Sequence, residues 1–166
     1  LGPDTELELN GLQRLDTGSV ESGFARTGRT GLFTSDSTSG ETIGRAVVRH
    51  RRNDRWSYEG GGEIAYNFLD TDSAYEENGV PVALPGASVL VEELRGEAFG
   101  QATWRPTSSL TIETGLRVEV SEIRQSGDTD TAKSFVYPKP RLLMTWIPAP
   151  QHQFRFRIER EVGQLD

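Results

Sequence analysis

Apolar and polar side chains alternate along the segment from Leu110 to Val120. Most even-numbered positions are apolar, whereas Glu113, Arg117 and Glu119 occupy odd-numbered positions. A β-strand sends successive side chains to opposite faces, so this period of two predicts a strand with one apolar and one charged face. The predicted apolar face includes Leu110, Ile112, Leu116 and Val118.

The same alternation recurs from Trp56 to Phe68 and from Phe154 to Ile158, and turn-forming residues separate further segments of this kind. We predict strands at residues 41–52, 55–69, 89–105, 109–124, 135–147 and 153–162, with two less distinct strands at 5–15 and 30–34. No helical period of useful length appears. The sequence therefore predicts an all-β fold, an antiparallel meander of about 6–8 strands.

The predicted connections alternate in length. Tight turns are expected at 53–54, 106–108 and 148–151, and long, mobile polar loops at 70–88 and 125–134. Short turns that alternate with long loops are typical of outer-membrane β-barrels. The longest strands, of about fifteen residues, also exceed the roughly five or six residues usual in soluble sheets. Aromatic residues lie near strand ends, where the girdles of a membrane barrel would sit: Trp56, Tyr58, Tyr66, Trp104 and Trp146.

Composition narrows the function classes. The 166 residues are 34% hydrophobic, with a mean hydropathy of −0.53, and no segment approaches the roughly 18 apolar residues of a transmembrane helix. A net charge of −7 argues against nucleic acid as a partner, because phosphate contacts need clustered cations. Five arginines between positions 45 and 55 are the exception, and we interpret them as a solvated strand end or part of a barrel lumen.

Patterns for catalysis and metal binding are weak. Cysteine is absent, His50 and His152 are the only histidines, and no G-x-S-x-G motif occurs, so no catalytic triad or thiolate site is predicted. Residues 70–73 begin like a calcium loop, but Tyr75 stands where that loop requires glycine. The glycines at 60–62 lie within a predicted strand, where they favour a bend, a bulge or close packing over a phosphate cradle. We predict no enzyme, no cofactor and no metal site.

Several short motifs follow one another in a characteristic order. Residues 97–104 read EAFGQATW, and residues 115–119 read GLRVE. Further along the chain come PKPRL at 138–142, WIP at 146–148 and FRFR at 154–157, before a final REVGQLD. In this order the motifs resemble consecutive hairpins in the barrel of TonB-dependent outer-membrane receptors. The resemblance extends over residues 44–166 and is weak before them.

The resemblance implies a setting and a function. It implies part of an outer-membrane receptor that takes up a scarce ligand, such as an iron chelate or an oligosaccharide, in a Gram-negative bacterium. The implied partners are outer-membrane lipid, a plug domain, TonB and an unidentified small ligand. Five charged residues would face the lumen, where they would hold the plug, guide a ligand or only solvate the interior: Arg117, Glu119, Arg155, Arg157 and Glu159.

The chain is too short for a whole receptor of this family. Such receptors have about 22 strands around a plugged lumen, and 166 residues leave only about 7.5 per strand. We therefore expect residues 1–166 to form a single all-β unit, a fragment from the middle of a receptor barrel that lacks the plug domain and has no transport activity alone. The alternative is a soluble all-β binding or structural module whose apolar face is an ordinary core.

A fragment of this kind would have two open strand edges and an uncovered apolar face. Both features seek partners, so we expect an isolated fragment to curl into a small closed barrel or sandwich, or to self-associate. Curling would bring these residues into a common core: Trp56, Ile64, Phe68, Leu116, Val118, Phe154 and Ile158.

Overall fold

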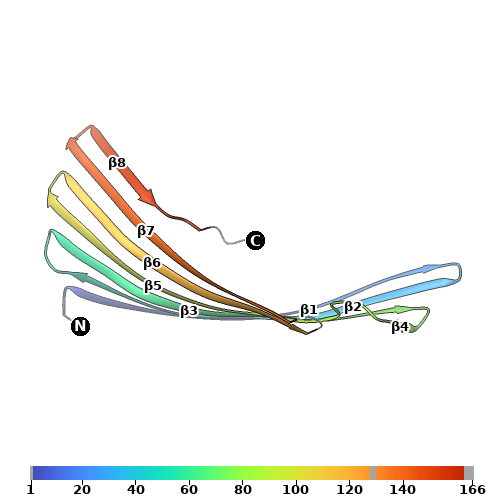
Figure 1. Ribbon diagram of the computed structural model, residues 1–166. Helices are drawn as coiled ribbons and strands as arrows, with labels where there is room; N and C mark the ends of the chain where they lie inside the picture. Colours follow the sequence, from blue (N-terminus) through green and yellow to red (C-terminus); the bar gives the residue numbers. More distant parts are fainter. Residues whose placement is uncertain (1, 128–129, 163–166) are drawn as a thin grey trace.

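The computed structural model describes residues 2–127 and 130–162, which form one antiparallel β-sheet (Figure 1). The strands are β1 Thr5–Arg26, β2 Arg29–Arg51, β3 Trp56–Glu77, β4 Val80–Val82, β5 Ser88–Thr107, β6 Leu110–Gly127, β7 Thr131–Ala149 and β8 His152–Glu159. Their order across the sheet is β1-β2-β3-β5-β6-β7-β8, and β4 pairs with β3. The predicted all-β meander is confirmed, with eight strands in the described part of the chain.

The N-terminal region contains more strand than the sequence predicts. β1 and β2 pair along their whole lengths, and Gly28, with a φ of +80°, turns the chain between them. The two short strands predicted at 5–15 and 30–34 are therefore wrong in extent. Most of β1 is exposed, and a ribbon with two exposed faces needs only its ladder of backbone hydrogen bonds, so no apolar alternation marks it.

The mobile loop predicted at 70–88 is also wrong, because most of this segment is strand. β3 continues to Glu77, and Asn78 and Gly79 then form a tight turn into β4 with φ values of +53° and +75°. Asn78 Oδ1 accepts a hydrogen bond from the Thr30 amide at 2.7 Å, which ties this turn to β2.

The loop predicted at 125–134 is shorter than expected. β6 continues to Gly127 and β7 begins at Thr131, and residues 128–129 of the predicted loop lie outside the described residues. The predicted alternation of short turns and long loops is therefore wrong. Strands that project beyond their neighbours at one end of the sheet take up the length assigned to loops (Figure 1).

The tight turns lie at or close to their predicted positions. The turn at 53–54 is confirmed. Pro106 and Pro148, which were predicted to form turns, instead lie near the ends of β5 and β7, each at a shift in the strand register. Proline lacks the backbone donor, so a strand tolerates it where the ladder is irregular. The turns themselves fall at 108–109 and 150–151.

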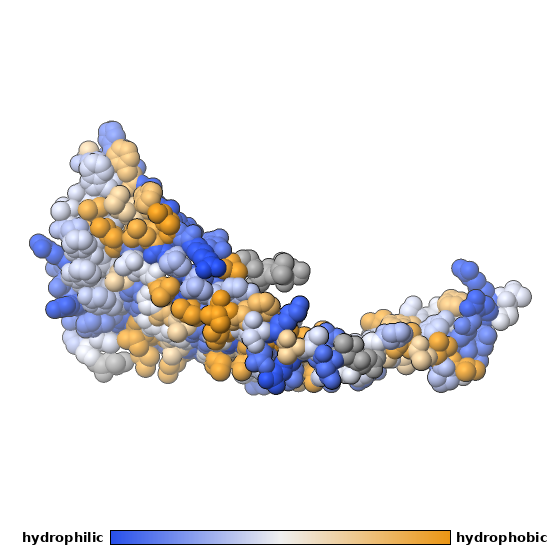
Figure 2. All heavy atoms as spheres, viewed as in Figure 1, coloured by the Kyte–Doolittle hydropathy of each residue, from blue (hydrophilic) through white to orange (hydrophobic). Residues whose placement is uncertain are grey.

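The sheet is curved and open (Figure 1). Among the described residues, the buried hydrophobic side chains are Val47 and Ala65, each 1% exposed. Hydrophobic side chains instead lie at the surface of the broad part of the sheet (Figure 2). The small closed barrel or sandwich expected of an isolated fragment is not formed, since Ile64, Phe154 and Ile158 are 59%, 55% and 57% exposed.

Candidate functional site on the polar face of the sheet

The strand register decides which side chains share a face. Arg117 of β6 lies opposite Phe99 of β5 and Lys139 of β7. Glu159 of β8 lies opposite Arg141, which is two residues from Lys139 and therefore on the same face. The register thus brings all five charged residues predicted from the sequence to one face, which we call the polar face: Arg117, Glu119, Arg155, Arg157 and Glu159.

Burial on the two faces is the reverse of that in a soluble protein. On the polar face of β6, Glu119 and Ser121 are only 6% and 8% exposed. On the opposite face of this strand, which we call the apolar face, Leu116 and Val120 are 50% and 47% exposed. Side chains crowd together on the concave side of a curved sheet and splay apart on the convex side. We infer that the polar face is the concave one.

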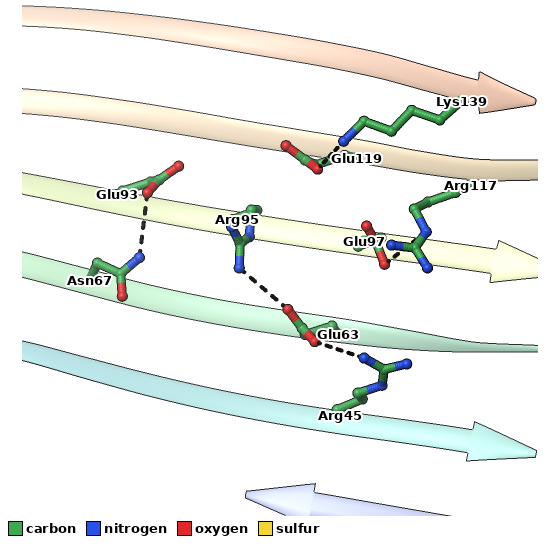
Figure 3. A network of polar contacts seen from close by, with 9 residues as sticks. All are labelled: Arg45, Glu63, Asn67, Glu93, Arg95, Glu97, Arg117, Glu119 and Lys139. Carbon is green, nitrogen blue, oxygen red and sulfur yellow. Dashed lines mark hydrogen bonds and ion pairs between the residues drawn. The ribbon is translucent and has the colours of Figure 1, made fainter. Parts of the chain in front are cut away.

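Ion pairs join neighbouring strands across the polar face (Figure 3). Glu63 of β3 lies 3.7 Å from Arg45 Nη1 of β2 and 3.4 Å from Arg95 Nη2 of β5, so one carboxylate links three strands. Arg117 Nε lies 3.4 Å from Glu97 Oε1. The side chains of Glu63 and Glu97 are only 20% and 14% exposed. Water and salt screen such partly buried pairs less than they screen surface pairs.

Two carboxylates lie directly opposite each other in this network. Glu97 of β5 and Glu119 of β6 form a cross-strand pair, and like charges in that position repel. Each has its own cation: Lys139 Nζ donates a hydrogen bond to Glu119 Oε2 at 2.8 Å, and Arg117 approaches Glu97. The two cations offset the repulsion between the carboxylates.

A second group of charges surrounds Arg49, near the β1 edge of the sheet. Its guanidinium lies 2.7 Å from Glu8, 3.0 Å from Glu59 and 3.8 Å from Glu6. Glu8 comes from β1 and Glu59 from β3, the two neighbours of β2, so Arg49 also links three strands. Carboxylates outnumber cations around this arginine.

The five predicted residues do not form one cluster. Arg117 and Glu119 belong to the network across the middle of the sheet. On β8, Arg157 forms an ion pair with Glu159. Arg155 has no ion pair among the described residues. The polar face is therefore an extended charged surface with several local groups.

Phe99 is the aromatic residue of this surface. The Cζ atoms of Arg45 and Arg117 lie 5.7 Å and 5.5 Å from its ring centroid, within the range of cation–π contacts. Phe99 lies opposite Gly61 of β3, where an added Cβ would be 3.1 Å from the ring. The absent side chain leaves room for the ring, so at this glycine the structure shows close packing, one of the three alternatives expected from the sequence.

The apolar face carries a belt without charged side chains. The positions of this face lack Asp, Glu, Lys and Arg over four ranges: 56–68 of β3, 94–104 of β5, 110–120 of β6 and 136–146 of β7. Aromatic residues mark both edges of the belt. At one edge Trp56 stacks on Trp104 with ring centroids 5.5 Å apart. At the other edge the Tyr66 hydroxyl donates a hydrogen bond to Glu92 at 2.6 Å.

Sequence reasoning did not name most members of the network. Glu63, Arg95, Glu97 and Lys139 lie at alternate positions of predicted strands, in phase with the charged face. Their position on the charged face could be predicted from this alternation. A pattern within one strand, however, does not show which charged residues meet across neighbouring strands. In the described part of the chain, no group of three or more His, Asp or Glu side chains is arranged to hold a metal ion.

Comparisons with known proteins identify the fold. No protein-family model matches the chain, and no curated protein matches it in sequence. The ferric citrate transporter FecA in its unliganded form is similar to the chain with a TM-score of 0.59 and 14% identity, over 95% of this chain and 25% of FecA. The ferric yersiniabactin uptake receptor FyuA from Yersinia pestis is similar with a TM-score of 0.52 and 12% identity, over 91% of this chain and 25% of FyuA.

The chain therefore spans about a quarter of the length of these two proteins. Both are TonB-dependent receptors, and the chain has the fold of a segment of such a receptor barrel. The resemblance seen in the sequence is confirmed at the level of the fold. These two structural neighbours are described as a transporter and a receptor.

Proposed function

We propose that the chain, which has the fold of a TonB-dependent receptor barrel, forms part of the barrel wall of an outer-membrane uptake receptor. The apolar face contacts lipid, and the polar face lines the lumen. The whole receptor takes up a scarce ligand, such as an iron chelate, into a Gram-negative bacterium, with a plug domain and TonB as partners. The segment alone transports nothing, because transport requires a closed wall.

The reversed burial of the two faces carries this proposal. Ile64, Leu94 and Leu116 of the apolar face are 59%, 52% and 50% exposed, whereas Glu119 of the polar face is 6% exposed. Leaving apolar surface in water costs about 25 cal/mol per Å², and large exposed apolar patches mark protein or membrane contacts. Lipid on the convex face removes this cost.

The height of the belt also fits a membrane. Its aromatic edges on β3 are Trp56 and Tyr66, ten residues apart, which is about 33 Å of strand. A strand tilted by about 45° then rises about 23 Å, close to the roughly 25 Å apolar band of outer-membrane barrels. The soluble module considered from the sequence requires a covered apolar face, and no described element covers it.

The orientation of the two faces is tested on the full-length receptor in lipid vesicles. Val136 lies on the apolar face and is 64% exposed, and Tyr137 is its neighbour on the polar face. Each is replaced by cysteine, Val136→Cys or Tyr137→Cys, and labelled with an environment-sensitive fluorophore. We expect brominated lipid to quench the label at position 136 and to spare the label at 137. Equal quenching at both positions, or quenching at 137 alone, contradicts the proposal.

The uptake function is tested in cells. FecA and FyuA are described as acting on ferric citrate and ferric yersiniabactin, which supports ferric chelates as the first ligands to examine. A strain that lacks the receptor should accumulate less iron from its ligand than the parent strain, and the intact gene should restore uptake. Removing TonB from the parent strain should reduce iron uptake as much as removing the receptor does. Unchanged uptake of every chelate tested would exclude iron chelates as the ligand.

A further inference from the structure

Arginines gather at the end of the sheet that carries its tight turns. Arg52, Arg55 and Arg105 are exposed and lie beside the turns at 53–54 and 108–109. None of the three forms an ion pair among the described residues, and segments 52–55 and 105–109 contain one acidic residue, Asp54. The Arg105 amide donates a hydrogen bond to the Arg55 carbonyl at 2.8 Å, so two residues of like charge are cross-strand neighbours. This end of the sheet therefore has a surplus of positive charge.

Arg52 stands on the apolar side of this end. Its amide donates a hydrogen bond to the Trp56 carbonyl at 3.0 Å, which extends the ladder between β2 and β3 by one pair. Residues paired across antiparallel strands share a face. Arg52 therefore lies in one row with Trp56 and Trp104, the stacked pair that marks this edge of the belt. A cation thus borders the aromatic edge on the side of the apolar face.

A hollow of the apolar face lies next to this row. Its volume is about 740 Å³, and its lining includes Val48, Tyr58, Gly60, Gly100, Ala102 and Leu116. Gly60 and Gly100 are cross-strand neighbours between Val48 of β2 and Leu116 of β6, so the middle of the row has no side chains. An added Cβ on Gly100 would meet nothing within 4 Å. We call this depression the Gly100 hollow.

The depths of Arg52 and the hollow match the two parts of one lipid molecule. Four residues separate Trp56 from Gly60, which is about 13 Å of strand. At a tilt of about 45° this strand rises about 9 Å, within one half of the roughly 25 Å apolar band of outer-membrane barrels. The hollow therefore lies at the depth of the acyl chains of one leaflet, and Arg52 lies at the depth of its headgroups.

The opposite edge of the belt has the opposite charge. On the apolar side beyond Tyr66, carboxylates predominate: Asp36, Asp70, Asp72, Glu92 and Glu122. Arg124 lies among them and forms an ion pair with Glu122. Short turns lie on the periplasmic side of outer-membrane barrels, so the cationic edge belongs to the periplasmic leaflet. An anionic headgroup is attracted to this edge and repelled by the other.

We propose that this edge of the apolar face holds one anionic phospholipid of the periplasmic leaflet, with its phosphate on Arg52 and an acyl chain in the Gly100 hollow. The inference rests on the proposed function, in which the apolar face contacts lipid. A planar guanidinium binds a phosphate through two parallel hydrogen bonds, which fixes the position of the headgroup. Arg55 and Arg105 add positive potential, which favours a headgroup with a net negative charge over a zwitterionic one.

The first test asks which lipid occupies the hollow. The full-length receptor is reconstituted in phosphatidylcholine vesicles with a small fraction of phosphatidylglycerol that carries a photoreactive diazirine in one acyl chain. After irradiation, mass spectrometry locates the labelled residues. Labelling at 98–102 and 114–116 should be about fivefold higher than with a diazirine phosphatidylcholine of the same chains, because one arginine near the surface supplies a preference of that size. Equal labelling by the two lipids would overturn the inference.

The second test removes the cation. Arg52→Gln should lower labelling by phosphatidylglycerol about fivefold, because the phosphate loses its partner. Arg124→Gln is the matched control, since it removes an arginine from the same side of the sheet at the opposite edge of the belt. It should leave labelling within about twofold of wild type. Equal effects of the two variants would overturn the inference.

The third test fills the hollow and leaves Arg52 in place. Gly100→Leu adds an apolar side chain where an added Cβ meets no other atom, so the barrel should fold while the acyl chain loses its place. Labelling at 114–116 by phosphatidylglycerol should fall to the level of the phosphatidylcholine probe. Unchanged labelling in Gly100→Leu would show that the hollow holds no chain, and it would overturn the inference.

Two checks separate failure of this inference from failure of the proposed function. Every variant is first examined for outer-membrane location and for the heat-sensitive gel mobility of a folded barrel. A receptor found outside the outer membrane would overturn the proposed function itself. A folded outer-membrane barrel that both diazirine lipids label equally overturns the phospholipid site alone.

Discussion

The large hydrophobic side chains of the belt lie on the apolar face, whereas those of the ribbon that projects beyond it, except Leu32, lie on the side of the polar face. The projecting ribbon comprises residues 16–39 of β1 and β2 and residues 69–82 of β3 and β4 (Figure 1). There Phe24, Phe33 and Tyr75 lie on the side of the polar face. On the side of the apolar face the ribbon carries five acidic residues: Glu21, Asp36, Asp70, Asp72 and Glu76.

This reversal occurs within continuous strands. β2 and β3 pair from Gly31 opposite Glu77 to Arg51 opposite Ser57 without a shift in register. The backbone alternation is therefore the same in both regions, and only the identity of the side chains changes. This reversal is expected if the same side of the sheet contacts lipid along the belt and water along the ribbon. The polarity of a face reports its surroundings, whereas the period of two reports only the strand.

The largest expected difference between the two regions comes from a charge on the apolar side. Leu116→Arg in the belt should lower the free energy of unfolding of the receptor by about 2–4 kcal/mol, because the charge enters lipid. Leu32→Arg, on the corresponding side of the ribbon, should cost less than about 0.5 kcal/mol. Denaturant unfolding in lipid vesicles measures both. Equal losses would break the comparison.

A second contrast separates the polar and apolar faces of the strands that carry the belt. A Cβ on Gly61 would lie 2.3 Å from the Ala46 carbonyl oxygen and 3.1 Å from the Phe99 ring, whereas nothing lies within 4 Å of one on Gly100. Gly61→Ala should therefore cost about 1–3 kcal/mol through overpacking. Gly100→Ala should cost less than about 0.5 kcal/mol. The same unfolding measurement applies, and a larger loss at Gly100 would show that the apolar face is the crowded one.

The ion pair between Glu119 and Lys139, on the polar face of the strands that carry the belt, should give a smaller loss. Glu119→Gln leaves Lys139 without its carboxylate on the crowded face, at a cost of about 1–2 kcal/mol. Glu113→Gln is the control, because Glu113 shares the strand and the face and has no ion pair among the described residues. It should unfold like the wild type. A loss at Glu113 as large as at Glu119 would show that charge on this face matters more than pairing.

The smallest effect is expected at the ion pair of the ribbon. Arg29 and Glu77 have side chains that are 64% and 32% exposed, so Arg29→Gln should cost less than about 0.5 kcal/mol. Salt at 1 M should remove this cost because it shortens the Debye length to about 3 Å. The loss in Glu119→Gln should persist in the same salt. Salt-sensitive stability at Glu119 would mean that the polar face is as open to water as the ribbon.

The two faces of the strands that carry the belt could largely be predicted from the sequence. Leu116, Arg117, Val118 and Glu119 alternate in polarity, and the alternation alone assigned them to opposite faces of a strand. It did so because one face of these strands, the belt, is consistently apolar, which is the condition under which a period of two becomes visible. The antiparallel meander and its resemblance to a receptor barrel followed from several such segments in order.

Only the tertiary structure decided the extent of the ribbon and the partners on the polar face. Strands such as β1 are held by backbone hydrogen bonds and have no consistently apolar face, so residues 16–26 left no pattern to read. The contacts of Glu63 with Arg45 and Arg95, and the hollow at Gly100, depend on the offset between neighbouring strands. That offset is a relation between segments far apart in the chain, and alternation within a single strand carries no information about it.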